Sequence, residues 1–279
     1  METSATRRRG WEWGALRVLH PFPAILVTAV TVAIVPFADT DAEFAVYLVL
    51  GLGMLCYQFA IGVANDLVDA DLDAAVKPWK PIPRGALSRR AAVVVAAALA
   101  GAGVLVTSGL DLVPWLVGVG GLACGLAYDV HLKRTPWSWL PWAIAFPLIP
   151  VWVYAAADAW EPRLWWAFPL GGLLALSLYF ANQAPGADDE RSLGVGGLAQ
   201  SAGERRSRAL ALGLFGVAGS GAVAVLLFEG TGPAMLAAIA AGVAALLAPR
   251  ATAYFGRDGM FGVLAVGAVG LAFAFLSAA

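Results

Sequence analysis

The chain has 279 residues, of which 60% are hydrophobic and 13% are charged, and its formal net charge at pH 7 is -1. This composition, with a mean hydropathy of +0.76, excludes an ordinary soluble domain, which is nearer half apolar and a quarter charged. The near-zero net charge gives no reason to expect a nucleic-acid partner. The composition therefore predicts an all-α, polytopic membrane protein whose main partner is the lipid bilayer.

Nine apolar stretches are long enough, or almost long enough, to cross a bilayer, which takes about 20 residues. They cover residues 18–37, 43–64, 91–109, 112–129, 137–157, 164–183, 208–228, 232–249 and 259–278. The loops after the even-numbered stretches and the N-terminal tail hold every Lys and Arg except Arg163. By the positive-inside rule we expect the N-terminus and these loops in the cytoplasm and the C-terminus outside.

Residues 1–279 are predicted to form a single membrane domain with a weak internal duplication. Two acidic segments lie four apolar stretches apart, and each precedes glycine and basic residues. This pattern suggests two pseudo-repeats, roughly 18–130 and 137–249, followed by a ninth helix over 259–278.

The first acidic segment, residues 64–88, reads ANDLVDADLDAAVKPWKPIPRGALS and follows the second apolar stretch directly. Asp66, Asp69 and Asp73 are spaced i, i+3 and i+7, so a continuous helix would place all three carboxylates on one face, with Asn65 beside them. Like charges on one stripe repel one another unless a cation or a metal-bound polyanion lies between them. Oxygen ligands of this type suit Mg2+, which uses carboxylates together with substrate phosphates.

Basic residues follow these acids. Lys77, Lys80 and Arg84 are cations suited to phosphate oxygens. Three prolines among them break the helix, so Lys77 and Arg84 could fold back over the acids. Asp71 lies off the acidic stripe and is expected to be an ordinary solvated residue. The alternative for the whole segment is a solvated loop whose acids and bases pair with one another.

The run NDLVDADLD, followed by KPWKPIPRGALS, resembles the first signature of the UbiA-type intramembrane prenyltransferases. That signature is N-D-x-x-D-x-x-x-D followed by a basic, proline-rich segment that ends in Gly. Residues 128–136, YDVHLKRTP, are similar to the family's Tyr…Leu-Lys-Arg stretch after the fourth helix. The resemblance implies a UbiA-like bundle of about nine transmembrane helices in which both acidic loops face the cytoplasm.

The resemblance also implies a site for Mg2+ and the diphosphate of a prenyl donor. The implied metal ligands of the first motif are Asn65, Asp66, Asp69 and Asp73. The implied diphosphate contacts are Lys77, Arg84, Lys133, Arg134 and Tyr128. The candidate catalytic residues among these are Asp66, Asp69, Tyr128 and Lys133. Metal and cations would stabilise the departing diphosphate, and an electron-rich acceptor would capture the allylic cation.

The second acidic segment, residues 181–199, reads ANQAPGADDERSLGVGGLA and departs from the family's D-x-x-x-D pattern. With Asp189 in the last acidic position, the position four residues earlier is Pro185, whose side chain cannot bind a metal. Asp188 and Asp189 are the candidate ligands for a second metal ion, with Asn182 and Glu190 as further candidates. The alternative is a polar loop that has partly lost this function.

The expected activity is Mg2+-dependent transfer of a prenyl group from a prenyl diphosphate to a small hydrophobic or aromatic acceptor. We expect it at the cytoplasmic face of a cell membrane, and the Ala, Gly, Val and Arg usage favours a bacterial source. The alternative on the same scaffold is a membrane terpene cyclase, which needs no second substrate. A transporter is disfavoured because it would need acids near the middle of its spans, whereas here the acids lie at the ends.

Overall fold

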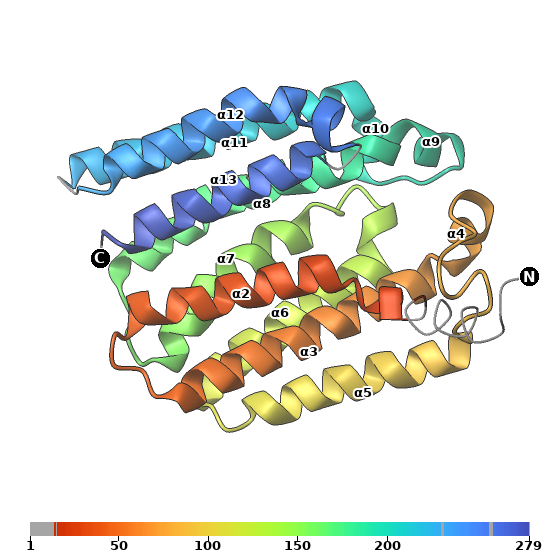
Figure 1. Ribbon diagram of the computed structural model, residues 1–279, viewed down its shortest axis with the longest axis horizontal. Helices are drawn as coiled ribbons and strands as arrows, with labels where there is room; N and C mark the ends of the chain where they lie inside the picture. The colour runs from red at the N-terminus through yellow and green to blue at the C-terminus, as the bar shows by residue number, and fades with distance from the viewer. Residues whose placement is uncertain (1–13, 15, 230–231, 257–258, 279) are drawn as a thin grey trace, which may run out of the picture.

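A computed structural model describes residues 14, 16–229, 232–256 and 259–278, and in these ranges the chain is helical and contains no strand (Figure 1). The longer helices are α2 (Pro21–Ala38), α3 (Phe44–Val68), α5 (Arg89–Thr107), α6 (Leu112–Val130), α7 (Leu140–Ala156), α8 (Pro169–Gln183), α11 (Glu204–Phe228), α12 (Ala234–Phe255) and α13 (Gly259–Leu276). The short elements are η1 (Arg17–Leu19), α4 (Ala70–Val76), η2 (Leu132–Arg134), η3 (Pro162–Ala167), η4 (Ala184–Gly186), α9 (Ala187–Ser192) and α10 (Leu198–Ala202).

Within the described ranges, seven helical segments are long and apolar enough to cross a membrane. Six of them are α2, α3, α5, α6, α11 and α13, and the seventh is the segment Pro162–Ser192, which contains α8. The apolar parts of the other two long helices, Leu140–Ala156 and Met235–Ala251, are shorter. The prediction of an all-α membrane bundle is confirmed. That α7 and α12 also cross the bilayer, which would make nine spans, stays a prediction.

The bundle has two halves with separate apolar cores. Helices α2, α3, α5 and α6 lie on one side of α7, and α8, α11, α12 and α13 lie on the other (Figure 1). The first core includes Leu50, Tyr57 and Val153, and the second includes Phe215 and Leu271. Helix α13 packs within the second half, against α12 and α8. The predicted duplication of sequence segments stays a prediction.

Small residues let α3 lie close to its neighbours in the first half. A Cβ atom on Gly103 of α5 would lie 2.6 Å from the Tyr57 ring, and one on Gly125 of α6 would lie 2.3 Å from the Ile61 Cδ1 atom. Close contact between backbones is how helices pack where lipid removes the hydrophobic driving force. The Tyr57 and Thr107 hydroxyls, 2.8 Å apart, add a buried hydrogen bond between α3 and α5. This packing fixes the position where α3 ends and the first acidic segment begins.

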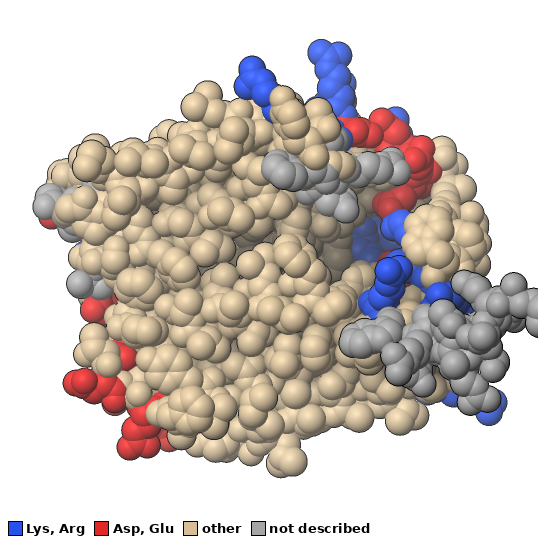
Figure 2. Space-filling model, viewed as in Figure 1, with Lys and Arg blue, Asp and Glu red and all other residues tan. Residues whose placement is uncertain are grey.

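Both acidic segments lie at the same end of the bundle. Helices α4 and α9 both lie at that end in Figure 1, and α13 ends at the opposite one. In the view of Figure 2 the Lys and Arg side chains gather at the α4–α9 end, whereas the opposite end carries acidic side chains. Arg7, Arg8 and Arg9 of the expected cytoplasmic tail lie outside the described residues. The orientation of the bundle in the bilayer stays a prediction.

Candidate active site

The acids of the first segment lie where α3 passes into α4. Helix α3 ends at Val68 and α4 begins at Ala70, so Asp69 lies at the junction of the two helices. Asp66 and Asp73 are buried, while Asp69 is partly exposed. Asp69 has α-helical backbone angles, its N–H donates to the Asn65 carbonyl, and the N–H of Asp73 donates to the Asp69 carbonyl, so the backbone stays close to helical through the junction. The Asp69 carboxylate contacts two cations from the α6–α7 connection. The common face of the three carboxylates stays a prediction.

Lys80 joins Asp66 and Asp73. Its Nζ atom donates hydrogen bonds to Asp66 Oδ1 at 2.8 Å and to Asp73 Oδ2 at 2.6 Å. Burial by itself would lower the pKa of Lys80, but the hydrogen bonds and charges of the two aspartates outweigh it and raise that pKa above the ordinary 10.5. The ammonium group therefore stays charged at neutral pH and neutralises part of the charge of this acid pair.

The proline-rich turn after α4 brings Lys80, and not Lys77 or Arg84, back to the acids. Lys77 and Arg84 are exposed, and within the described part of the chain neither forms an ion pair. Gly85 has a φ of +76°, a conformation that favours glycine, and it ends this turn just before α5. The expectation that Lys77 and Arg84 fold over the acids is wrong, because the turn directs Lys80 to them instead.

His20 is a second partner of Asp66 that the sequence did not single out. Its Nε2 atom lies 2.9 Å from Asp66 Oδ1, across 46 residues of sequence. His20 has a φ of +47° immediately before Pro21, the first residue of α2. A non-glycine residue in this left-handed region is uncommon and is held by its surroundings. No local pattern predicts this contact, because it depends on how α2 packs against α3.

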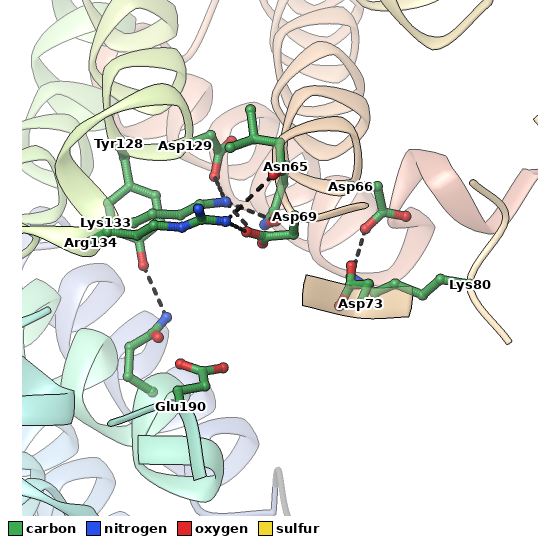
Figure 3. Close-up of polar contacts among 12 residues, drawn as sticks. Asn65, Asp66, Asp69, Asp73, Lys80, Tyr128, Asp129, Lys133, Arg134 and Glu190 are labelled. Carbon is green, nitrogen blue, oxygen red and sulfur yellow. Dashed lines mark hydrogen bonds and ion pairs between the residues drawn. The ribbon is translucent and has the colours of Figure 1, made fainter. Parts of the chain in front are cut away.

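Asp69 belongs to a second polar group at the end of α6. Its Oδ2 atom lies 2.8 Å from Lys133 Nζ, and its Oδ1 atom accepts a hydrogen bond from Arg134 at 3.1 Å. Lys133 Nζ also donates to Asn65 Oδ1 at 3.5 Å and lies 3.9 Å from Asp129 Oδ1 (Figure 3). Three oxygen-bearing side chains from α3, the α3–α4 junction and α6 thus surround one ammonium group.

Asp129 is the functional candidate that sequence reasoning missed. It is 1% exposed, and its Oδ2 atom is buried without a hydrogen-bond partner in the described structure. Burying a carboxyl oxygen that has no hydrogen-bond partner is costly, which makes this position unusual for a purely structural residue. The available signal was its spacing: Asp129 precedes Lys133 by four residues at the end of an apolar stretch.

The second acidic segment is connected to Tyr128 through two amides. Glu190 accepts a hydrogen bond from Gln200 Nε2 at 2.8 Å, and the same nitrogen donates to Gln183 Oε1 at 3.2 Å. Gln183 Nε2 in turn donates to the Tyr128 hydroxyl at 3.0 Å. Sequence reasoning selected Tyr128 and Glu190 but not the two glutamines that link them.

The remaining acids of the second segment are exposed. Asp188 and Asp189 lie on the exposed side of α9, and Asp188 pairs with Arg191 at 3.0 Å. Asn182 is exposed near the end of α8. Within the described ranges, no three Asp, Glu, His or Cys side chains lie close enough together to hold a metal ion. A second metal ion on Asp188 and Asp189 stays a prediction.

An apolar cavity lies between α2, α3, α6 and α7. Ile61, one turn of α3 before Asn65, lines it near that centre, and Tyr57, Gly118 and Trp152 line it further along. Phe146 also lines this cavity and stacks on Trp142 with ring centroids 5.2 Å apart, and the Trp142 ring meets the Tyr128 ring edge-on at 6.1 Å. An apolar cavity with aromatic walls therefore comes within one turn of α3 of the charged centre.

A helical membrane bundle with cations and carboxylates above an apolar cavity has the features of an intramembrane site for a molecule with an anionic head and an apolar chain. The chain belongs to the UbiA prenyltransferase family, which it matches over residues 24–260. The predicted family, and with it the predicted class of prenyl-transferring enzyme, is confirmed at the level of the family.

Two archaeal enzymes illustrate the sequence similarity. A digeranylgeranylglyceryl phosphate synthase from Natronomonas pharaonis is 40% identical over 75 residues, which is 26% of each chain. One from Methanoregula boonei is 29% identical over 195 residues, 68% of this chain and 69% of that one. The match thus spans about a quarter of the length of the first relative, and the activity in its name does not transfer directly to this chain.

Solved structures show the same fold. A UbiA homolog from Archaeoglobus fulgidus bound to GPP and Mg2+ has a TM-score of 0.74 and 16% sequence identity, covering 95% of this chain and 99% of its own. An apo UbiA homolog from Aeropyrum pernix K1 has a TM-score of 0.72 and 19% identity, covering 91% and 97% of the two chains. The integral membrane location follows from this fold and the apolar helices.

Proposed function

We propose that this protein transfers a prenyl group from a prenyl diphosphate to a lipophilic acceptor in a Mg2+-dependent reaction. The observation that carries the proposal is the juxtaposition of two environments that match the two parts of such a donor. Lys80, Lys133 and Arg134 lie among carboxylates at the end of α3, and the apolar cavity begins one turn away at Ile61.

The basic residues are suited to the diphosphate head. Arg134 offers a fork of donors to phosphate oxygens, and the ammonium groups of Lys133 and Lys80 add two compact positive charges. The donor oxygens proposed for Mg2+ are those of Asn65, Asp66, Asp69 and Asp73, and their hard-ligand chemistry fits this ion. When bound, Mg2+ would neutralise charge that develops on the leaving diphosphate.

The walls of the cavity are suited to the prenyl chain and to the cation that its ionisation leaves. Breaking the C–O bond gives diphosphate and an allylic cation. An electron-rich acceptor then forms a new bond to that carbon and loses a proton, which the released diphosphate takes up. Apolar walls keep water away from the cation. Phe146, which stacks on Trp142, adds an aromatic ring to the wall of the cavity.

Two further observations support this proposal. Solved relatives include UbiA homologs bound to GPP and Mg2+ and to DMAPP and Mg2+. Relatives by sequence include digeranylgeranylglyceryl phosphate synthases and a 4-hydroxybenzoate octaprenyltransferase. We also propose that the α4–α9 end, where the basic residues gather, faces the cytoplasm of a bacterial cell, in agreement with the positive-inside rule.

The proposal is tested with purified protein in detergent, Mg2+ and prenyl diphosphates of 10, 15 and 20 carbons, first alone and then with a panel of phenolic, quinone-precursor and glycerol-phosphate acceptors. A prenylated acceptor that forms only with Mg2+ is the expected product. A cyclic hydrocarbon formed from the donor alone would instead identify a membrane terpene cyclase. Failure to bind any of the donors in a metal-dependent way would contradict both activities.

A further inference from the structure

We propose that Asp129 is a further metal ligand, which together with Asn65 and Asp69 forms a cation site at the end of α6. The inference rests on the proposed function, since it concerns the same diphosphate centre. It adds a carboxylate from outside both acidic segments.

The geometry around Lys133 supports this assignment. Its Nζ atom lies 2.8 Å from Asp69 Oδ2, 3.5 Å from Asn65 Oδ1 and 3.9 Å from Asp129 Oδ1. The side chains of Lys133 and Asp129 are 11% and 1% exposed, so the group is largely removed from solvent. The ammonium group of Lys133 thus lies among three side-chain oxygens, from Asp69, Asn65 and Asp129. Two carboxylates and an amide oxygen, completed by phosphate oxygens and water, are a ligand set that Mg2+ accepts.

The unpaired oxygen of Asp129 is an independent observation that points to a cation. Oδ2 is buried and has no partner in the described structure. Asp129 has one cation within ion-pair distance there, Lys133, and that contact is long. The present arrangement therefore leaves this carboxylate incompletely compensated, which a divalent ion beside it would correct.

The balance of charge when the donor diphosphate binds also supports Asp129 as a metal ligand. Lys133 is proposed to contact the donor diphosphate, and a move toward that anion would take its charge away from Asp69 and Asp129. Two buried or half-buried carboxylates would then face each other without the ammonium between them. A divalent cation held by Asp69 and Asp129 would compensate both carboxylates.

The second acidic segment makes such a ligand useful. Asp188 is exposed and paired with Arg191, and Glu190 is held by Gln200. Asp129, in contrast, already faces Asn65 and Asp69 (Figure 3). A carboxylate from α6 would in this way supply negative charge that the altered second motif does not bring to the centre.

The test measures Mn2+ binding by electron paramagnetic resonance, with the protein in detergent and with or without inorganic diphosphate. Mn2+ replaces Mg2+ because both prefer oxygen ligands and Mn2+ is visible to the method. We expect Asp129→Asn to weaken Mn2+ binding about tenfold or more. The matched control is Asp71→Asn, an exposed acid of the first segment paired with Arg89, which should bind Mn2+ as the wild type does.

Lys133→Met separates a metal ligand from a residue that merely holds Lys133 in place. If Asp129 binds metal, removing the competing ammonium leaves Mn2+ affinity without diphosphate equal to or higher than that of the wild type, whereas Asp129→Asn lowers it. If Asp129 only positions Lys133, both variants weaken diphosphate binding and neither weakens Mn2+ binding, which would overturn the inference.

A metal-specificity switch keeps the test independent of folding. In Asp129→Cys, a thiol ligand should favour Cd2+ over Mn2+ relative to the wild type, which carries the same Cys56 and Cys124. Unchanged metal preference in this variant, or unchanged Mn2+ binding in Asp129→Asn, would overturn the inference alone. Failure of the wild type to bind Mn2+ with or without diphosphate would overturn the proposed function as well.

Discussion

The two acidic segments lie at the same end of the bundle, but their side chains are arranged very differently. In the first, Asp66 and Asp73 are buried against Lys80, and Asp69 contacts Lys133 and Arg134. In the second, the acids are exposed or held by amides, and the link to the centre passes through neutral hydrogen bonds to Tyr128. Similar composition at corresponding positions therefore does not imply similar chemistry, because buried charges must be compensated by specific partners whereas exposed ones are solvated.

The largest expected effect is in the first segment. Asp66→Asn keeps the shape of the side chain but removes a buried charge that faces Lys80 and His20. We expect prenyl transfer to fall about 1,000-fold, as when a preorganised electrostatic group is lost. The initial rate of product formation measures this, with Asp71→Asn as the control. A rate within a few-fold of the wild type would contradict the assignment of Asp66 to the centre.

Lys80→Met should lower the transfer rate about 100-fold, because the ammonium is proposed to contact the diphosphate. It should also lower the Tm by roughly 5–10 °C, because it leaves two buried carboxylates without their cation. Lys77→Met removes an exposed lysine from the same turn and should change neither quantity. Equal effects of the two substitutions would contradict the selective role of Lys80.

The pH dependence of stability sharpens this prediction. The pKa of Lys80 is raised above 10.5 in the folded protein, so its contribution is fully present below pH 10.5 and is lost as the pH rises through the folded pKa. The Tm difference between the wild type and Lys80→Met should therefore be constant near neutral pH and shrink above pH 10.5. A difference that persists undiminished at high pH would indicate a packing effect of the alkyl stem.

A smaller effect is expected where the second segment contacts Tyr128. Gln183→Ala breaks the hydrogen-bonded connection from Tyr128 to Gln200, and the loss of a neutral hydrogen bond predicts a decrease of about fivefold in transfer rate. The adjacent, exposed Asn182 provides the control, and Asn182→Ala should be silent. A large loss in Asn182→Ala would instead support the sequence prediction that this residue belongs to a second metal site.

The smallest effects are expected for the exposed acids. Asp188→Asn and Asp189→Asn should each change the transfer rate by less than about threefold, since exposed charges contribute little. Steady-state rates over a range of Mg2+ concentrations would measure this. A rise of tenfold or more in the Mg2+ concentration that gives half-maximal rate, in either variant, would contradict this prediction and support a second metal site on Asp188 and Asp189.

The sequence predicted the long helices and the position of the first acidic segment at the end of α3, because apolar length and acidic spacing are local properties of the chain. It could not predict which cation meets which acid. Lys80 instead of Lys77 reaches Asp66 because of the turn that three prolines impose, and His20 does so because two helices pack side by side. The significance of Asp129 likewise emerges only when the ends of α3 and α6 are placed together.

The most direct test of this contrast is Mg2+-dependent binding of geranyl diphosphate, measured by calorimetry on the wild type, Asp69→Asn and Asp188→Asn under the same conditions. Our account predicts that Asp188→Asn binds like the wild type and that Asp69→Asn loses the Mg2+-dependent part of the affinity. Retention of that affinity in Asp69→Asn, or an equal loss in both variants, would contradict the central claim that the first segment forms the diphosphate centre.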